Sequence, residues 1–234
     1  MDILLLIAKN ATSSTCSESA TARGHGQRII SFAFYNNRKI KNKLSHSSMS
    51  STDEEFTGIM ENLKLVEKYY PSYTMRLYTD ITEKTHSNRH SELCAIYCNH
   101  PKLDICNVYR LGNQNITNIN YLRRHTILLV LGFLCNIQLK FTESYSDISP
   151  YYGMLWRFAP MADPLVIEWH SRDLASRINE REVSAVSEWL STDKHFHIMR
   201  DHPTNRDKIK GCCFGMKIDT ELTDLEHNPL PIQG

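Results

Sequence analysis

The sequence predicts an α/β protein with a mostly parallel central sheet and flanking helices on both faces of the sheet. Two observations lead to this fold class: the chain contains two strand–helix–strand patterns, and each pattern closes with an acidic turn. Two strands joined through a helix usually run parallel in one sheet. The chain has 234 residues, 41% of them hydrophobic, which is sufficient for one large domain with its own core.

The first pattern consists of a strand at 29–34, a polar loop at 36–52, a helix from about 53 to 70 and a strand at 74–78. Thr52 and Glu55 have the spacing of a capping box, which predicts the start of the helix. Pro71 ends the helix because it cannot continue the backbone hydrogen bonds. Asp80 follows the second strand and closes the pattern.

The second pattern consists of a strand at 165–167, closed by Trp169 and a polar turn at 170–173, then a helix at 179–190 and a strand at 196–199. Asn179 and Glu182 form the asparagine variant of a capping box at the start of this helix. The turn Arg200-Asp201-His202 ends the last strand. A further short helix is expected at 91–98, with three residues facing inward: Leu93, Ile96 and Tyr97.

Parallel strands place their carboxyl ends at one edge of a sheet, which is where open α/β sheets bind ligands. We therefore expect the turns at 172–173 and 200–202 to lie close together. Carboxylates hold a hard divalent cation and guanidinium groups match phosphate, so this set of residues suits a cation with phosphate oxygens. The alternative is that these charges are solvated residues that cap the strand ends.

Several segments together resemble a little-characterised family that is similar to the GT-A type of nucleotide-diphospho-sugar glycosyltransferases. The segments are WRFAPMADPLV at 156–166, SRDLASRINERE at 171–182, EWL at 188–190, HIMRDHP at 197–203 and GCCFG at 211–215, with a weaker match in YYPSYTMRLYTD at 69–80. The resemblance implies a GT-A or Rossmann-like nucleotide-sugar-binding core, which this chain holds in incomplete form. It also implies a sugar nucleotide as donor and an acceptor that the sequence does not identify.

In that superfamily an Asp-x-Asp signature holds Mn²⁺ or Mg²⁺ on the diphosphate. The resemblance assigns the metal contact to Asp173, whereas the position of the second acid is Ala175. Arg172 and Arg177 would then neutralise phosphate. One carboxylate with waters can still hold a cation that the diphosphate also binds, although the loss of an anionic ligand weakens the site.

Five other residues receive roles from the same resemblance. Asp201 and His202 would complete the facing loop, either as further ligands or as acceptor-side groups. Arg157 and Asp163 would contact the donor or brace their turn. Asp80 would help to hold the nucleoside, or would simply end its strand.

Trp156 and Trp169 are interpreted as core residues rather than sugar-stacking platforms. No general base can be named from the sequence. The net charge of +1, from 27 basic and 26 acidic residues, gives no bulk electrostatic reason for binding nucleic acid or an anionic membrane.

The seven cysteines leave two interpretations open. Cys94, Cys98 and Cys106 invite a zinc interpretation, but the second close pair of ligands is missing. Under oxidising conditions Cys98 and Cys106 could form a disulfide, and when reduced they would be small core residues. Composition does not identify the compartment, although the resemblance implies the secretory pathway or Golgi lumen.

The predicted organisation has an atypical or disordered amino terminus at 1–26 without a convincing signal peptide, a glycosyltransferase-like domain at 27–217 and a disordered tail at 218–234. Residues 121–150 are interpreted as an insertion into this domain. Their apolar run at 127–135 is about half the length of a membrane-spanning helix, so membrane association is not expected.

Two functions from different classes follow. The first is a glycosyltransferase that binds a nucleotide sugar through a divalent cation. The second is a catalytically inactive or truncated domain that serves as a binding module, favoured by Ala175 and by Cys212-Cys213 in a glycine-rich position.

Overall fold

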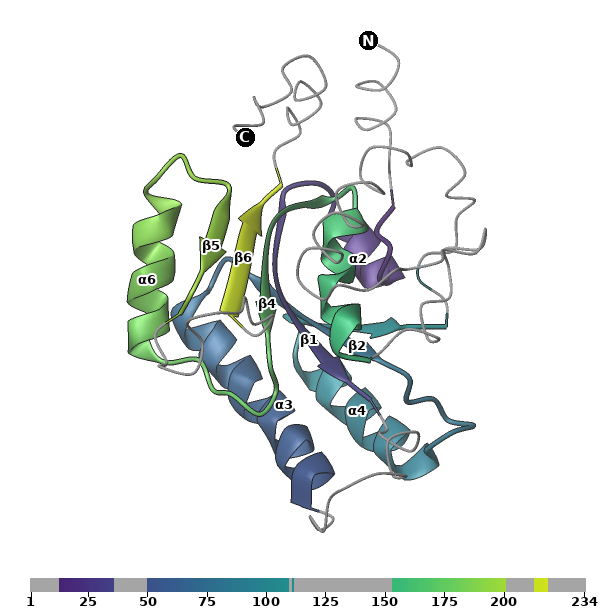
Figure 1. Cartoon of the computed structure of the whole chain (residues 1–234). Helices are drawn as coiled ribbons and strands as arrows, with labels where there is room; N and C mark the ends of the chain where they lie inside the picture. The colour runs from purple at the N-terminus through teal and green to yellow at the C-terminus, as the bar shows by residue number, and fades with distance from the viewer. Residues whose placement is uncertain (1–12, 36–49, 110, 112–152, 201–212, 219–234) are drawn as a thin grey trace, which may run out of the picture.

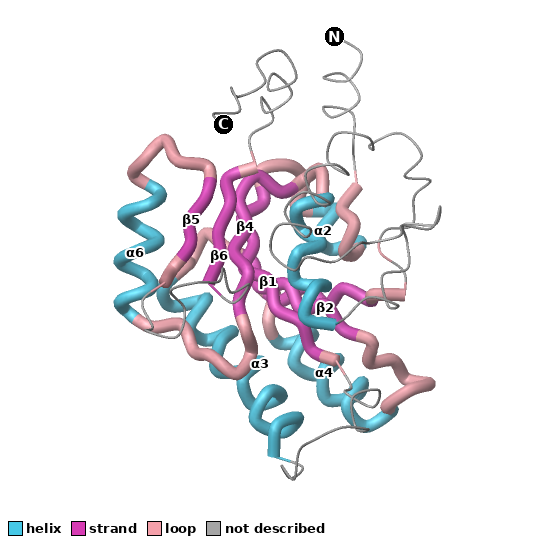
Figure 2. Tube along the Cα trace, in the orientation of Figure 1, coloured by secondary structure: helices cyan, strands magenta, loops and turns pink. Residues whose placement is uncertain are grey.

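The computed structural model describes residues 13–35, 50–109, 111, 153–200 and 213–218. These residues form a six-stranded sheet in the order β3-β2-β1-β4-β6-β5 (Figure 2). The strands are β1 (Gln27–Phe34), β2 (Thr74–Thr79), β3 (Leu103–Asn107), β4 (Val166–Arg172), β5 (Phe196–Ile198) and β6 (Cys213–Lys217).

The sheet is mixed. The pairs β1–β2, β1–β4 and β2–β3 are parallel, whereas β6 is antiparallel to both β4 and β5. Because β4 and β5 are each antiparallel to β6, they run parallel to each other. The predicted crossover unit therefore has the expected strand directions, but β6 lies between its two strands.

Helices cover both faces of the sheet, so the predicted α/β class with flanking helices is confirmed (Figure 1). The helices α3 (Ser50–Tyr69), α4 (Ser87–Asn99) and α6 (Glu180–Leu190) pack on the face that includes Ile30, Phe32 and Met75. The other face carries α2 (Glu18–Ala22) and the 3₁₀ helix η1 (Gly153–Ala162). Adjacent residues of β1 point to opposite faces, as the pleat of a strand requires.

Trp156 and Trp169 lie in the core, as predicted. Trp156 is 4% exposed and Trp169 is fully buried. The indole nitrogen of Trp169 donates to Ser31 Oγ at 2.5 Å and to the Arg157 carbonyl at 3.0 Å. A buried indole N–H needs such acceptors, so these contacts fix the ring in place.

The helix starts were predicted with mixed success. Asn179 caps α6 as expected, because its side chain accepts a hydrogen bond from the Glu182 backbone N–H at 3.0 Å. The Thr52 cap was wrong, since α3 begins two residues earlier, at Ser50. The predicted helix at 91–98 is longer in the structure, and its Tyr97 is 37% exposed rather than inward.

The amino-terminal part of the fold extends further than the predicted boundary at residue 27. Residues 13–26 include α2, and a disulfide joins Cys16 to Cys106. Of the two alternatives considered for Cys98 and Cys106, a disulfide between them is therefore wrong, and Cys98 is an exposed free thiol rather than a core residue.

Other predictions fall outside the described residues: the insertion at 121–150 with its apolar run, the residues Asp201 and His202, and the tail from 219 onward. In the part of the chain that the structure describes, no helix is both long and apolar enough to cross a membrane.

Candidate functional site

The candidate site is the turn that follows β4. The strand was predicted to end before a turn at 170–173, but β4 continues through Arg172. Its even-numbered residues, Glu168, His170 and Arg172, consequently form contacts on the α3 and α6 side of the sheet. Asp173 is the first residue after the strand.

Asp173 presents a partly exposed carboxylate at this turn. Its side chain is 36% exposed, and its carboxylate lies 3.6 Å from the guanidinium of Arg157. Arg157 comes from η1 and is almost fully buried, and it also donates to the Arg172 carbonyl at 3.2 Å. Among the described residues its Nε has no hydrogen-bond partner. The site thus combines an accessible carboxylate with a buried cation.

Helix α3 fixes the chain that follows Asp173. The buried side chain of Asn62 donates to the carbonyls of Leu174 and Ser176, at 3.3 and 3.1 Å, and accepts from the Ile178 N–H at 3.4 Å. Gly58, one turn earlier, allows close approach, because a Cβ there would overlap the Leu174 carbonyl oxygen. Helix α3 therefore holds the turn through the backbone groups of the turn.

The two arginines that were predicted to neutralise phosphate are paired within the protein. Arg172 forms a buried ion pair with Glu182 of α6 at 2.8 Å. Arg177 pairs with Glu61 of α3 and donates to the Leu174 carbonyl. In this structure both guanidinium groups join helices to the turn.

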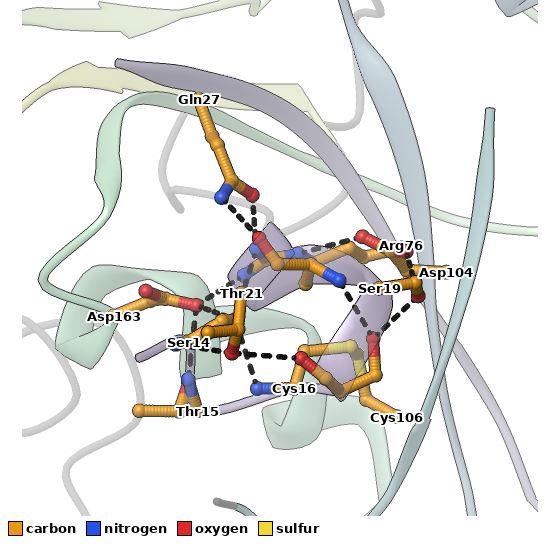
Figure 3. The surroundings of a disulfide bond; sticks show 12 residues. Ser14, Thr15, Cys16, Ser19, Thr21, Gln27, Arg76, Asp104, Cys106 and Asp163 are labelled. Atoms are coloured by element: carbon orange, nitrogen blue, oxygen red, sulfur yellow. Dashed lines mark hydrogen bonds and ion pairs between the residues drawn. A yellow bond between two sulfur atoms is a disulfide. The ribbon is translucent and has the colours of Figure 1, made fainter. Parts of the chain in front are cut away.

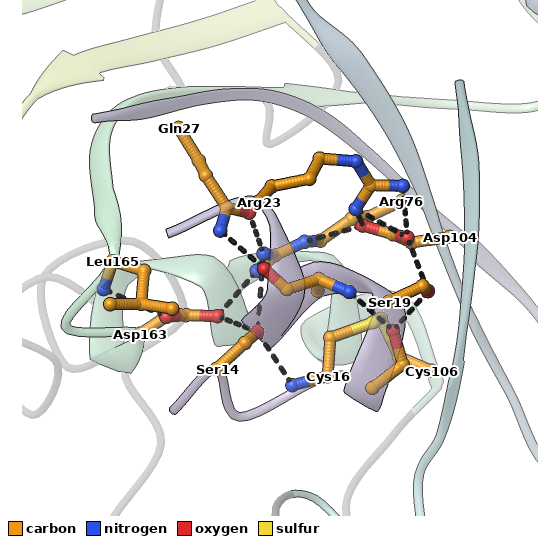
Figure 4. A network of polar contacts seen from close by, with 12 residues as sticks. Ser14, Cys16, Ser19, Arg23, Gln27, Arg76, Asp104, Cys106, Asp163 and Leu165 are labelled. Carbon is orange, nitrogen blue, oxygen red and sulfur yellow. Dashed lines mark hydrogen bonds and ion pairs between the residues drawn. A yellow bond between two sulfur atoms is a disulfide. The ribbon is translucent and has the colours of Figure 1, made fainter. Parts of the chain in front are cut away.

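Asp163 braces its turn, which is one of the two roles considered for it. It is fully buried and accepts hydrogen bonds from the Leu165 N–H at 2.9 Å, from Arg76 at 2.7 Å and from Ser14 at 2.5 Å. Figure 4 shows Ser14, Arg76 and Leu165 around the Asp163 carboxylate. Because the oxygens of Asp163 already accept these hydrogen bonds, Asp163 is a poor candidate for contact with a sugar nucleotide.

Arg76 links Asp163 to the rest of this network. It donates to Gln27 at 2.7 Å, and its Nε lies 3.5 Å from Asp104. Asp104 also pairs with Arg23 at 2.8 Å. The Cys16–Cys106 disulfide lies within the same cluster (Figure 3). The buried charges are thus paired, and they attach the segment around α2 to the sheet.

A third polar cluster surrounds Glu168. Its carboxylate accepts a hydrogen bond from the Tyr73 hydroxyl and lies 3.1 Å from His170 Nε2. Burial alone would raise the pKa of Glu168, but the hydrogen bonds from His170 and Tyr73 outweigh it, so the pKa lies below its ordinary value. Burial, with the hydrogen bond to Glu168, raises the pKa of Tyr73.

Sequence reasoning missed Gly58, Asn62 and Arg76. A signal existed for the first two: glycine and asparagine are poor helix formers, yet both lie inside a long helical pattern. Arg76 carried a weaker signal, a charged residue in the middle of an apolar strand. Within the described ranges, no group of three or more His, Cys, Asp or Glu side chains is arranged to hold a metal ion.

No family model, curated protein or solved structure matches this chain.

Proposed function

We propose that this protein binds a nucleotide-diphospho-sugar at the carboxyl ends of β1, β2 and β4, in a mostly parallel, GT-A-like half of the sheet. The observation that carries the proposal is the pairing of the exposed carboxylate of Asp173 with the buried guanidinium of Arg157. Both residues belong to the segments that resemble the glycosyltransferase family. Mn²⁺ or Mg²⁺ would bind Asp173, and the cation would be shared with the diphosphate.

Arg157 has the chemistry to assist a diphosphate. Its Nε is a buried donor without a hydrogen-bond partner among the described residues, and phosphate oxygens satisfy guanidinium donors well. Asp80, which follows β2, would contact the nucleoside in this proposal. Asp201 and His202 keep their predicted roles as further ligands or acceptor-side groups. The sugar would pass to an acceptor whose identity stays open.

A second candidate, a binding module without transferase activity, is favoured by a specific observation. The two arginines predicted to neutralise phosphate are already paired with Glu182 and Glu61. Ala175 also leaves the site one carboxylate short of the Asp-x-Asp signature. In this case the protein would bind a nucleotide sugar weakly and would not cleave it.

Calorimetric titration tests the binding of a nucleotide sugar, which both candidate functions require. The protein is titrated with UDP, GDP and their sugar conjugates, with and without Mn²⁺. We expect Mn²⁺-dependent binding of one nucleotide, weakened about tenfold or more in Asp173→Asn because a cation loses its anionic ligand. Asp193→Asn is the matched control, since Asp193 is an exposed carboxylate whose ion pair is with Lys194. Binding that is unaffected by Asp173→Asn would contradict the proposal.

A second variant separates the two candidates. Ala175→Asp restores the second acid, and we expect it to strengthen Mn²⁺-dependent binding. Release of free sugar from the bound nucleotide by the native protein supports the transferase. Binding without release, in the native protein and in Ala175→Asp, supports the module.

A further inference from the structure

The strand β5 forms one edge of the sheet, and part of its backbone faces away from its neighbour β6. The Lys217 N–H donates to the His195 carbonyl at 2.8 Å, so every second residue from His195 onward is hydrogen-bonded to β6. The intervening residues, Phe196 and Ile198, therefore direct their N–H and C=O groups outward. Among the described residues, no backbone hydrogen bond satisfies these four groups.

The opposite edge of the sheet, β3, is covered by helices. The Tyr97 hydroxyl of α4 donates to Ser19 of α2 at 3.0 Å, which joins helices from the two faces of the sheet. Arg23, directly after α2, pairs with Asp104 of β3 at 2.8 Å. Phe196 of β5 is by contrast 50% exposed. An uncovered edge strand offers its backbone groups to another strand, so β5 is the edge that can accept one.

The charge near β5 favours an acidic strand. The side chain of Lys194 is 75% exposed before the strand, and Arg200 is exposed after it. Asp193 pairs with Lys194 at 3.3 Å, but an ion pair this exposed is weak. In the sequence, residues 193–217 contain six Lys or Arg and three Asp, a net charge of +3, whereas the whole chain has +1.

The same charges disfavour a second copy of the chain as the added strand. Antiparallel pairing of two β5 strands about a twofold axis at His197 would satisfy the outward groups of Phe196 and Ile198. It would also place Lys194 of one copy opposite Arg200 of the other. Like charges that face each other across a strand pair are destabilising. A strand with carboxylates at these two positions would instead be attracted.

The side chains of β5 indicate what the middle of the added strand contains. Phe196 packs beside Phe214, with ring centroids 6.0 Å apart, and Ile198 packs on the same apolar cluster. His197 points to the other face and stacks on Trp189 at 5.5 Å. Apolar side chains on an added strand would lie beside Phe196 and Ile198 and extend this cluster.

We propose that the free edge of β5 binds an extended segment of a partner protein by strand addition. The segment has an apolar centre and acidic ends. Its backbone hydrogen-bonds to the outward groups of Phe196 and Ile198, and its carboxylates face Lys194 and Arg200. The proposal is independent of the nucleotide-sugar site.

A synthetic peptide tests this proposal. The probe is a capped, fluorescein-labelled heptapeptide with glutamate at both ends, two valines at its third and fifth positions and threonine elsewhere. Fluorescence anisotropy measures its binding to the full chain. We expect replacement of both glutamates by lysine to weaken binding about tenfold or more, because like charges then meet. N-methylation of both valines should abolish binding, since it removes the backbone donors that face β5.

Variants of the protein test the same contacts from the other side. Lys194→Glu combined with Arg200→Glu should reverse the preference between the glutamate and lysine peptides. Lys84→Glu is the matched control, because Lys84 is an exposed lysine outside this region. Ile198→Pro removes an outward N–H and leaves the hydrogen bonds to β6 in place, as proline on an edge strand allows. It should abolish binding in a protein whose melting temperature shows that it is folded.

Hydrogen exchange followed by NMR locates the bound peptide. We expect slower exchange at the amides of Phe196 and Ile198 and no change at His197, which already faces β6. Three results would overturn the proposal. One is no binding of the glutamate peptide, and another is equal binding of its N-methylated form. The third is a doubled mass in sedimentation equilibrium without peptide, with Phe196 and Ile198 already protected, which would identify a second copy as the occupant.

Discussion

Several buried charged residues in this protein belong to hydrogen-bonded polar clusters. Glu168 is the clearest case, since it accepts the Tyr73 hydroxyl, lies beside His170 and has a longer ion pair with Arg28 at 3.6 Å. A buried carboxylate is stable only when its oxygens are hydrogen-bonded. The lowered pKa of Glu168 means that these contacts favour its charged form.

We expect Tyr73→Phe to lower the free energy of unfolding at pH 7 by about 1.5–3 kcal/mol, because a hydrogen bond to a charged group is lost. Urea denaturation measures this difference. Tyr97→Phe is the control, since Tyr97 donates to Ser19 at an exposed position.

The native protein and Tyr73→Phe also test how the stability contributed by Glu168 depends on pH. The pKa of Glu168 is lower in the folded protein than in the unfolded chain. The ionised Glu168 therefore contributes fully to stability above its unfolded-state pKa, which is about 4.3. This contribution is lost as the pH falls through the folded-state pKa. The difference between native protein and Tyr73→Phe should therefore narrow below about pH 4. A difference that stays constant down to pH 3 would show that the contribution of the Tyr73 hydroxyl does not depend on the charge of Glu168.

At the scale of elements, α3 positions the candidate site. Asn62 satisfies three backbone groups of the chain after Asp173, and Gly58 lets the helix approach the same turn. The site is thus built on a strand end and supported from behind by a helix.

Asn62→Ala should destabilise the protein by about 2–3 kcal/mol, because it removes three hydrogen bonds at once, including the acceptor of the buried Ile178 N–H. Asn99→Ala removes an exposed asparagine that donates only to the Ala95 carbonyl, at 2.8 Å, and should cost far less. Thermal unfolding of the two variants provides the comparison. Equal losses would contradict the role assigned to Asn62.

We expect Gly58→Ala to destabilise the protein, which is the opposite of the usual effect of this substitution in a helix. Replacing glycine by alanine inside a helix normally stabilises it by about 1 kcal/mol. Here the added Cβ would overlap the Leu174 carbonyl oxygen and approach Arg177, so either α3 or the turn must shift. We expect a lower melting temperature and weaker nucleotide binding, whereas a higher melting temperature would show that the turn can move freely.

Across the whole molecule, the disulfide joins distant parts of the fold. Cys16 and Cys106 are separated by 90 residues and connect the segment of α2 to β3. Closing a loop of that length reduces the entropy of the unfolded chain. The buried Arg76 network holds the same segment by ion pairs and hydrogen bonds.

We expect the double variant Cys16→Ser, Cys106→Ser to lose about 4–5 kcal/mol of unfolding free energy in the absence of reductant, by the loop-entropy argument. Cys98→Ser, at an exposed free thiol, should change stability little. Guanidinium denaturation measures both. A loss below about 1 kcal/mol for the double variant would mean that the ion-pair network alone holds the segment.

The sequence predicted the features that depend on local pattern. The Asn179 cap, the burial of Trp156 and Trp169, and the alternation of strands with helices all follow from short-range spacing. The Asp173 turn was also identified, because turn chemistry follows an apolar run.

Other features depend on contacts between distant segments, which local patterns do not encode. The partner of Cys106 lies 90 residues away, and β6 enters the sheet between strands that precede it in sequence. The wrong start of the turn, which was predicted at 170–173, has the same cause. Once β4 pairs with β6 up to Arg172 and Cys213, that arginine becomes a strand residue and reaches Glu182.

The position of β6 also has a consequence for synthesis on the ribosome. The strand β5 leaves the ribosome before β6, yet β6 is the strand it pairs with in the sheet. Lys217 of β6 also donates to the last carbonyls of α6, at Trp189 and Leu190, and lies over the Trp189 ring. Until residues 213–217 emerge, the nascent chain therefore carries an unpaired strand and an incompletely covered helix. During this interval the protein would be most dependent on chaperones.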